Sequence, residues 1–165
     1  MKAQRGGFRV GRHEQLLQEV AHDSYKPARK LTEGTRCRDC GAVYRRGRWS
    51  VATTVARSAH LGRCPACRRM REHFPAGYIS LKGDFYRTQR DEILALVRHC
   101  EADEKGRHLL ERIMAIREGH DGALVTTTGI HLARRIADAV QAAYKGRLRF
   151  RYNKADKLLR AYWSR

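Results

Sequence analysis

Four of the five cysteines fall into two CxxC pairs, which is the spacing of metal-binding knuckles. They are Cys37 and Cys40 in CRDCGAVYRRGRW, and Cys64 and Cys67 in CPACRR. Each CxxC turn directs two thiolates at one point, so two turns complete a tetrahedral shell of four sulfurs. Because four cysteine ligands leave no position for a water, we expect one structural Zn²⁺ rather than a catalytic ion. An iron–sulfur cluster is the alternative for these ligands.

Two further residues near this chemistry have simpler interpretations. His60 precedes the second cysteine pair and could replace a ligand, but an exposed loop histidine is the favoured interpretation. Cys100 lies on the apolar face of a predicted helix, so we expect it in the core. A ribbon as short and polar as residues 34–77 cannot fold on apolar burial alone. Structural zinc contributes about 10–16 kcal/mol of apparent binding energy, which would fix its loops.

Arginine is concentrated around the cysteine pairs. Residues 37–77 carry nine positive and two negative side chains, a net charge of +7. Arginine suits bidentate contacts with phosphate and stacking on bases, and tryptophan can stack on an unpaired base or pack within the ribbon. From the ribbon we expect RNA contacts at Arg45, Arg46, Arg48, Trp49, Arg68, Arg69 and Arg71.

A second set of arginines alternates with apolar residues in GRLRFRYN, near the C-terminus. The alternation predicts a strand whose basic face is formed by Arg147, Arg149 and Arg151. Such side chains repeat every 6.6–6.8 Å or so, which is close to the spacing of phosphates along a nucleic acid strand. On an open sheet face they would bind phosphates; otherwise they only keep the face soluble.

The helix before this strand offers further polar groups. His131, Arg134 and Arg135 lie on its polar side and are candidate RNA contacts, although Arg134 can also pair with Asp138 at i+4. The TTTG segment preceding the helix presents hydroxyls and amides at a positive helix end. This segment could bind a phosphate or cap the helix.

The elements that must position these side chains follow from periodicity and turn signals. We expect a basic extension over 1–33, with an amphipathic stretch at 13–23; a four-cysteine zinc ribbon over 34–77, with a hairpin turning at Arg46-Gly47; and an α+β RNA-binding domain over 78–165. In that domain we expect strands at 78–83, 109–118, 123–128, 146–153 and 158–163, and helices from Thr88 to Gly106 and from Thr128 or Gly129 to Gly146.

This order, β-α-β-β-α-β-β, indicates a small split βαββαβ-like domain with an extra C-terminal strand. Two helices would cover one face of its sheet and leave the other partly open. The second helix has an apolar stripe that we expect to be buried: Ala133, Ile136, Ala137, Val140, Ala143 and Tyr144.

Charge and motifs restrict the classes of function. A net charge of +18 and a pI near 10.5 favour a polyanionic partner. With no long apolar run and no secretory signal, we expect a cytoplasmic protein that does not enter membranes. No P-loop, HExxH or GxSxG motif occurs, so we expect no enzyme and no small-molecule substrate. A DNA-binding or transcriptional ribbon protein, an RNA-processing enzyme and a protein-interaction ribbon are the alternatives.

Nearly the whole chain resembles a group of short bacterial zinc-ribbon proteins that are related to the large-subunit nuclear export adaptors of archaea and eukaryotes. The resemblance lies in CRDCGAVYRRGRW, CPACRR, PAGYISLKGDF and VTTTGIHLARRIADAVQAAYKGRLRFRY. In the adaptors, a strand leads into a helix that begins near a histidine, which corresponds here to His131. The adaptors dock on the large subunit around the transfer-RNA sites.

The resemblance therefore implies binding to ribosomal RNA and the ribosome, with the large subunit favoured. Together with the residues above, it predicts a monomeric, non-enzymatic, zinc-stabilised RNA-binding protein that acts with the ribosome. Hibernation, quality control and assembly are the roles left open.

Overall fold

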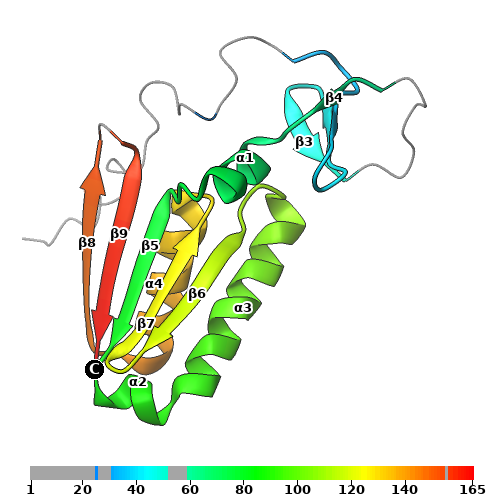
Figure 1. Cartoon of the computed structure of the whole chain (residues 1–165). Coiled ribbons are helices and arrows are strands. Elements are labelled where there is room, and N and C mark those ends of the chain that lie inside the picture. The colour runs from blue at the N-terminus through cyan, green and yellow to red at the C-terminus, as the bar shows by residue number, and fades with distance from the viewer. Residues whose placement is uncertain (1–24, 26–30, 52–58, 155) are drawn as a thin grey trace, which may run out of the picture.

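The computed structural model describes Tyr25 and residues 31–51, 59–154 and 156–165 (Figure 1). The amphipathic stretch expected at 13–23 lies outside these residues. The described residues form two sheets and four helices. Their elements are β1 (Arg36–Cys37), β2 (Val43–Arg45), β3 (Arg48–Ser50), β4 (Leu61–Gly62), α1 (Pro65–Glu72), β5 (Gly77–Lys82), α2 (Asp84–Thr88), α3 (Arg90–Arg107), β6 (Ile113–Gly119), β7 (Gly122–Thr127), α4 (Ile130–Tyr144), β8 (Arg147–Asn153) and β9 (Leu158–Ser164).

The first sheet belongs to the cysteine ribbon and has the strand order β3-β2-β1-β4. Its β2–β3 hairpin turns at Arg46 and Gly47, as predicted. Both residues have positive φ, 50° and 79°, which is the combination that a two-residue type I′ turn requires. The carboxylate of Glu33 accepts a hydrogen bond from the Arg46 N–H at 2.9 Å. This contact holds a non-glycine residue in a conformation that it adopts rarely.

Helix α1 directly follows the second cysteine pair and was not expected from the sequence. It begins with Pro65 in the first turn, and Cys64 is the N-cap. The Cys64 sulfur accepts a hydrogen bond from the Cys67 N–H at 3.4 Å. The helix ends at Glu72, and His73 follows as its C-cap with a left-handed φ of 51°. A CxxC pair therefore provides both a metal knuckle and the capped start of a helix.

The second sheet has the order β6-β7-β5-β9-β8. Strand β5 lies antiparallel to β7 and parallel to β9, and β8 lies antiparallel to β9. The α+β class is confirmed, and the predicted β-α-β-β-α-β-β order holds except that an unexpected short helix, α2, precedes α3. The extra C-terminal strand does not extend the edge of the sheet. Instead β9 inserts between β5 and β8, which leaves β8 as an edge strand.

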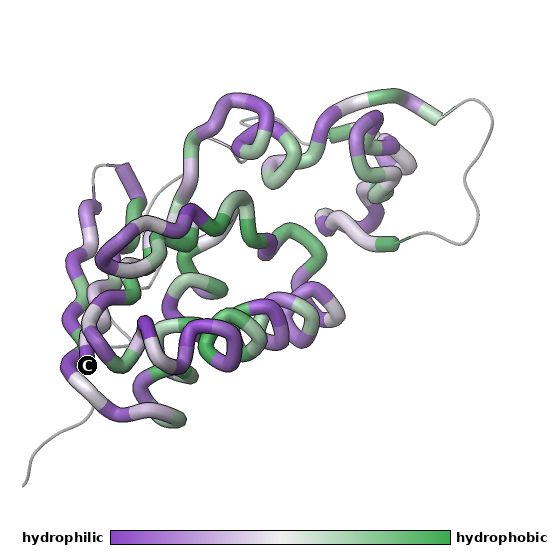
Figure 2. Tube along the Cα trace, turned by 60° about the horizontal axis from the view of Figure 1, so that its bottom comes forward, coloured by the Kyte–Doolittle hydropathy of each residue, from purple (hydrophilic) through white to green (hydrophobic). Residues whose placement is uncertain are grey.

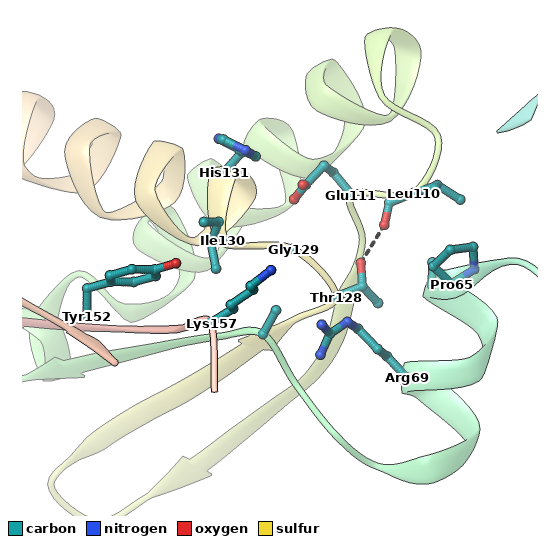
Figure 3. A pocket seen from close by; sticks show the side chains of 12 residues that line it. Pro65, Arg69, Leu110, Glu111, Thr128, Gly129, Ile130, His131, Tyr152 and Lys157 are labelled. Carbon is teal, nitrogen blue, oxygen red and sulfur yellow. Dashed lines mark hydrogen bonds between the residues drawn. The ribbon is translucent and has the colours of Figure 1, made fainter. Parts of the chain in front are cut away.

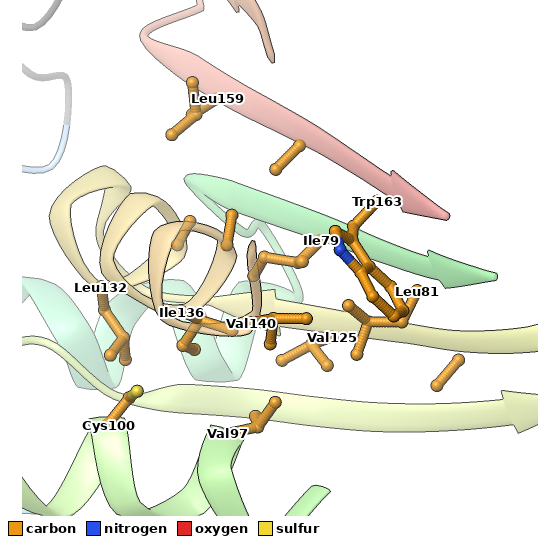
Figure 4. Packing of buried hydrophobic residues seen from close by; sticks show 14 of the residues in the cluster. Ile79, Leu81, Val97, Cys100, Val125, Leu132, Ile136, Val140, Leu159 and Trp163 are labelled. Atoms are coloured by element: carbon orange, nitrogen blue, oxygen red, sulfur yellow. The ribbon is translucent and has the colours of Figure 1, made fainter. Parts of the chain in front are cut away.

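Helices α3 and α4 pack together on one face of this sheet (Figures 1 and 4). Between the layers lie Ile79 and Trp163 from the sheet and Ile136 and Val140 from α4, none more than 1% exposed. Hydrophobic and hydrophilic residues alternate along the chain in Figure 2, as a fold with one buried face per element requires. Cys100 is buried in the same core, as predicted.

The predicted apolar stripe of α4 is confirmed in its centre and wrong at its end. Ala133, Ile136, Ala137 and Val140 are buried. Ala143 is exposed, whereas Tyr144 is half-buried and packs against the core beside Phe85. Ile130 and Leu132, outside the predicted stripe, are also buried.

Two predicted boundaries were wrong for local reasons. Thr88 does not cap the first long helix: it ends α2, and its hydroxyl donates to the Phe85 carbonyl at 3.0 Å. Helix α3 then starts at Arg90 without a side-chain cap. Strand β6 begins at Ile113 instead of residue 109, because residues 109–112 lie against the ribbon. Of the helices in the described segments, none is long and apolar enough to cross a bilayer.

The crossing of β5 and α4 provides a stability test. A methyl group at Gly77 would lie 2.3 Å from the Ala133 Cβ and 2.4 Å from the Thr127 Oγ1. We expect Gly77→Ala to lower the free energy of unfolding by about 1–3 kcal/mol in urea titrations, because the packed elements must separate.

Gly106 is the matched control, since a Cβ there meets nothing within 4 Å inside helix α3. We expect Gly106→Ala to raise the free energy of unfolding by about 0.5–1 kcal/mol. If both variants shifted stability in the same direction, the close β5–α4 packing would be contradicted.

Candidate metal centre and basic sheet face

The two cysteine pairs meet, as predicted. The sulfur atoms of Cys37, Cys40, Cys64 and Cys67 all lie within 4.8 Å of one another. The Cys40 and Cys64 sulfurs are 3.8 Å apart, and no cysteine forms a disulfide in the described part of the chain. A tetrahedral ion with metal–sulfur bonds of about 2.3 Å also places its sulfurs about 3.8 Å apart. The residues therefore fit one thiophilic, four-coordinate metal ion.

The protein backbone already holds these sulfurs in place. The Cys64 N–H donates to the Cys37 sulfur at 3.3 Å, which links the two knuckles. Burial raises the pKa of the Cys64 thiol far above its usual range, and burial raises the pKa of Cys67 to about 11. Buried thiols of this kind ionise when a cation binds them. The close spacing of the sulfurs and the burial of Cys37, Cys64 and Cys67 therefore suit a bound metal ion.

Arg112, immediately before β6, directs its guanidinium at the cysteine cluster. Its Nη2 lies 3.3 Å from the Cys40 sulfur, and its Nη1 lies 3.6 Å from the Cys67 sulfur. Burial alone would raise the pKa of the Cys40 thiol, but hydrogen bonds from Arg112 and the Ala42 backbone lower it to about 7. Four thiolates around a divalent ion carry a net charge of −2, which this guanidinium partly neutralises.

The same segment joins the ribbon to the larger sheet. Leu109 and Leu110 pack against the cysteine cluster. The Arg112 N–H donates to the Thr128 hydroxyl at 2.9 Å, at the loop that leads into α4. Arg112 was missed by the sequence analysis, because nothing in ERIMAIR distinguishes this arginine from the other basic residues. Only the fold brings it to sulfurs 45 and 72 residues away.

On the large sheet, the alternation predicted for 147–153 is confirmed. Arg147, Arg149 and Arg151 of β8 are exposed, whereas the apolar residues between them pack against the core. The helices lie on the apolar side, so the arginines lie on the opposite face. Within the residues that the structure describes, no helix covers that face (Figure 1).

Strand pairing brings further residues to this open face that the sequence analysis did not include. Arg151 lies opposite Arg160 of β9, which in turn neighbours Tyr78 of β5. The Arg160 guanidinium lies 5.2 Å from the centre of the Tyr78 ring. In the adjacent row, Arg149 lies opposite Tyr162, whose side chain is 37% exposed. We call these residues the basic sheet face: Tyr78, Arg147, Arg149, Arg151, Arg160 and Tyr162.

The candidate residues of α4 lie elsewhere. The helix covers the other side of the sheet, so the fold does not bring His131, Arg134 and Arg135 to the basic sheet face. Arg135 donates to Glu104 at 2.6 Å and to Asp103 at 3.2 Å, and Arg134 donates to Asp138 at 3.2 Å. The predicted i,i+4 pair is therefore present. These arginines already have acidic partners.

The ribbon arginines divide into exposed and buried ones. Arg45, Arg46 and Arg48 are exposed at the end of the hairpin, and Arg71 is exposed on α1. Arg69, which was predicted as an RNA contact, is instead buried. Its side chain is only 3% exposed, and its guanidinium stacks 4.1 Å from the centre of the Tyr25 ring.

The remaining residues named from the ribbon sequence, Arg68, Trp49 and His60, differ in burial and in their contacts. The half-buried Arg68 lies 3.8 Å from Glu72. Trp49 packs partly buried on the ribbon, with its ring edge-on to Tyr44 at 5.6 Å. His60 is exposed and is not part of the cysteine cluster, and its carbonyl accepts the Arg36 N–H at 2.7 Å.

Arg112 offers a direct test of the metal centre. We expect Arg112→Met to lose its metal to a competing chelator about 10–100-fold more readily, because the thiolate charge is no longer compensated. Metal retention is measured by titration with a chromophoric chelator. Arg107→Met is the control, because Arg107 is exposed at the end of α3. Equal metal loss from both variants would contradict a specific role for Arg112.

Comparison of the chain with protein-family models, with curated proteins and with solved structures finds no match.

Proposed function

We propose that this chain is a non-enzymatic, zinc-stabilised RNA-binding protein that associates with the ribosome, in particular with the large subunit. The observation that carries the proposal is the basic sheet face, where a row of arginines borders the exposed ring of Tyr162 and the half-buried ring of Tyr78. The ribbon hairpin, with Arg45, Arg46 and Arg48 at its end, provides a second basic contact. The binding role requires a charged surface and no catalytic step.

The basic sheet face suits nucleic acid for electrostatic reasons. Arg147, Arg149, Arg151 and Arg160 form no ion pair with any acidic side chain among the described residues. Neighbouring strands lie about 4.8 Å apart and alternate residues about 6.6–6.8 Å apart, so the four guanidinium groups form a compact patch. Unpaired cations at this density attract phosphates and release their counterions on binding.

The aromatic rings favour RNA over duplex DNA. Tyr162 presents an exposed ring beside Arg149, and Tyr78 lies beneath Arg160. Flat sheets with aromatic rings bind unstacked bases, which occur in the single-stranded loops of folded RNA. Reading duplex DNA instead requires a helix or ribbon that enters the major groove. The basic residues of α4 are paired with acids, which argues against such a role for that helix.

Zinc is the metal that best suits the cysteine cluster. Four thiolates with tetrahedral spacing bind Zn²⁺ in structural sites, and a closed shell leaves no room for a reacting water. The ion would fix the positions of both knuckles and thus of the hairpin arginines. In this proposal the metal stabilises the binding surface and does not contact the RNA.

Ribosomal RNA is the proposed partner because it supplies folded loops at high concentration in the cytoplasm. A net charge of +18 suits such a partner. The assignment to the large subunit rests on the resemblance of the ribbon and of the TTTG–helix segment to the export adaptors. We propose that the chain binds as a monomer.

The arginines of β8 provide the main test. We expect the triple variant Arg147→Gln, Arg149→Gln, Arg151→Gln to leave the ribosome fraction in sucrose gradients at lower salt than the wild type. Each lost phosphate contact reduces the slope of log affinity against log salt by about 0.7–0.9, so we expect a reduction of about 2–3.

A variant with equal loss of charge serves as control: Arg98→Gln, Lys105→Gln, Arg107→Gln on α3. These side chains are exposed on the opposite layer of the domain. If this control lost ribosome binding as strongly as the β8 variant, total charge would explain the binding. A wild-type protein that never sediments with ribosomes would contradict the ribosomal proposal itself.

Stacking on the sheet is tested at Tyr162. We expect Tyr162→Ala to weaken binding to an unstructured RNA oligonucleotide by about 5–150-fold, since stacking contributes about 1–3 kcal/mol per base. Fluorescence anisotropy measures the affinity. Tyr162→Phe keeps the ring and should bind like the wild type. A phenylalanine variant as weak as the alanine variant would attribute the contact to the hydroxyl group and contradict stacking.

A further inference from the structure

A small cavity lies where α1, the start of α4 and the start of β9 meet (Figure 3). Its volume is about 140 Å³, several times what one ordered water needs. Polar side chains that line it include Arg69, Glu111, His131, Tyr152 and Lys157. The cavity adjoins the cysteine cluster through Ala66 and Leu110 and lies on the helix side of β8, away from the basic sheet face.

Lys157 is the unusual member of this group. Its amine is buried and has no hydrogen-bond partner in the described part of the chain. Lys157 also has a φ of 48°, a left-handed value that is rare for a long side chain. A buried ammonium group without a partner is costly, so such groups are normally paired. Figure 3 shows this amine directed into the cavity, toward the loop that precedes α4.

A second cation shares the cavity. Arg69 is 3% exposed and donates from Nη1 to the Phe74 carbonyl at 3.2 Å. In Figure 3 its guanidinium points toward the same space as the Lys157 amine. The acidic side chain of the lining is Glu111, whose carboxylate accepts the Leu132 N–H of α4 at 3.0 Å. Two fixed cations thus face one carboxylate that is already engaged with the helix.

The hydroxyl of Thr128, which lines the cavity, and that of the neighbouring Thr127 are already engaged in hydrogen bonds. The Thr128 hydroxyl donates to the Leu110 carbonyl at 2.6 Å, and the Thr127 hydroxyl donates to the Gly129 carbonyl at 2.7 Å. Neither threonine caps α4, which begins at Ile130 and has Gly129 as its N-cap residue. The TTTG segment therefore shapes the cavity, and the positive end of the helix adds to its potential.

We propose that this cavity binds a phosphate monoester, the group carried by a nucleoside 5′-monophosphate and by the 5′ end of a phosphorylated RNA. A dianionic phosphate satisfies the Lys157 amine and is attracted by Arg69. A monoester also has one substituent, so it can enter a small cavity end-on, whereas an internal phosphodiester would have to thread two chains. The proposal does not depend on the RNA-binding function, because a small phosphate ligand is sufficient to test it.

The test uses the full chain with inorganic phosphate and adenosine 5′-monophosphate as probes in calorimetric titrations. We expect saturable binding of one ligand per chain. Lys157→Met should weaken it by roughly 10–100-fold, the loss expected for a charge-assisted hydrogen bond. It should also leave the thermal midpoint without phosphate equal to or above that of the wild type, since it removes an unpaired buried charge.

Lys154→Met is the matched control, because Lys154 is exposed on the same β8–β9 connection. It should bind both probes like the wild type, and so should the triple arginine variant of β8. Comparable loss in the Lys154 and Lys157 variants would overturn the proposal in favour of general charge attraction. Absence of saturable binding of both probes to the wild type would also overturn it.

The source of the phosphate is resolved with two RNA oligonucleotides of one sequence, one ending in a 5′-phosphate and one in a 5′-hydroxyl. If the phosphorylated oligonucleotide binds more tightly, and Lys157→Met removes only this difference, the cavity takes an RNA end. If the oligonucleotides bind equally while adenosine 5′-monophosphate still requires Lys157, the cavity takes a free nucleotide. Either result supports the phosphate site.

Discussion

Mutual repulsion among four closely spaced cysteine sulfurs is the constraint on which the rest of this structure depends. Thiolates within 4.8 Å of one another cannot all be charged unless a cation lies between them. The chain meets this requirement with a metal-ligand geometry at the centre and with Arg112 behind two of the sulfurs. Because Arg112 also leads into β6 and bonds to the loop before α4, the electrostatics of the ribbon and the packing of the larger domain are linked.

In the larger domain, one face of the sheet packs the core and the other carries the basic residues. Side chains of β5, β8 and β9 that point toward α3 and α4 form the core, and those of opposite parity form the basic sheet face. On α4, Arg134 is paired with Asp138 and Arg135 with Glu104. The arginines of the basic sheet face have no acidic partner among the described residues, so a polyanion can reach them there.

Several features could be predicted from local patterns, because their causes lie within a few residues. The CxxC spacing specified the sulfur cluster, Arg46-Gly47 specified the hairpin turn, and the period-2 pattern of 147–153 specified which arginines share a face. The same period-2 pattern in LLRAYW places Arg160 and Tyr162 on one face of their strand. In YISLKG it assigns Tyr78 to one face of its own strand. It does not say which strands are neighbours, so the basic sheet face could not be assembled before the strand order was known.

By itself, then, the sequence determined the four clustered cysteines, the strands and long helices of the larger domain, and the orientation of side chains within each strand, since these depend on spacing and on backbone geometry. The tertiary structure alone decided that β9 inserts beside β5, that Arg69 is buried while Arg149 is exposed, and that Arg112 reaches the sulfurs. Such outcomes depend on contacts between segments far apart in the chain. Long-range packing sets them, and no local pattern of residue types encodes it.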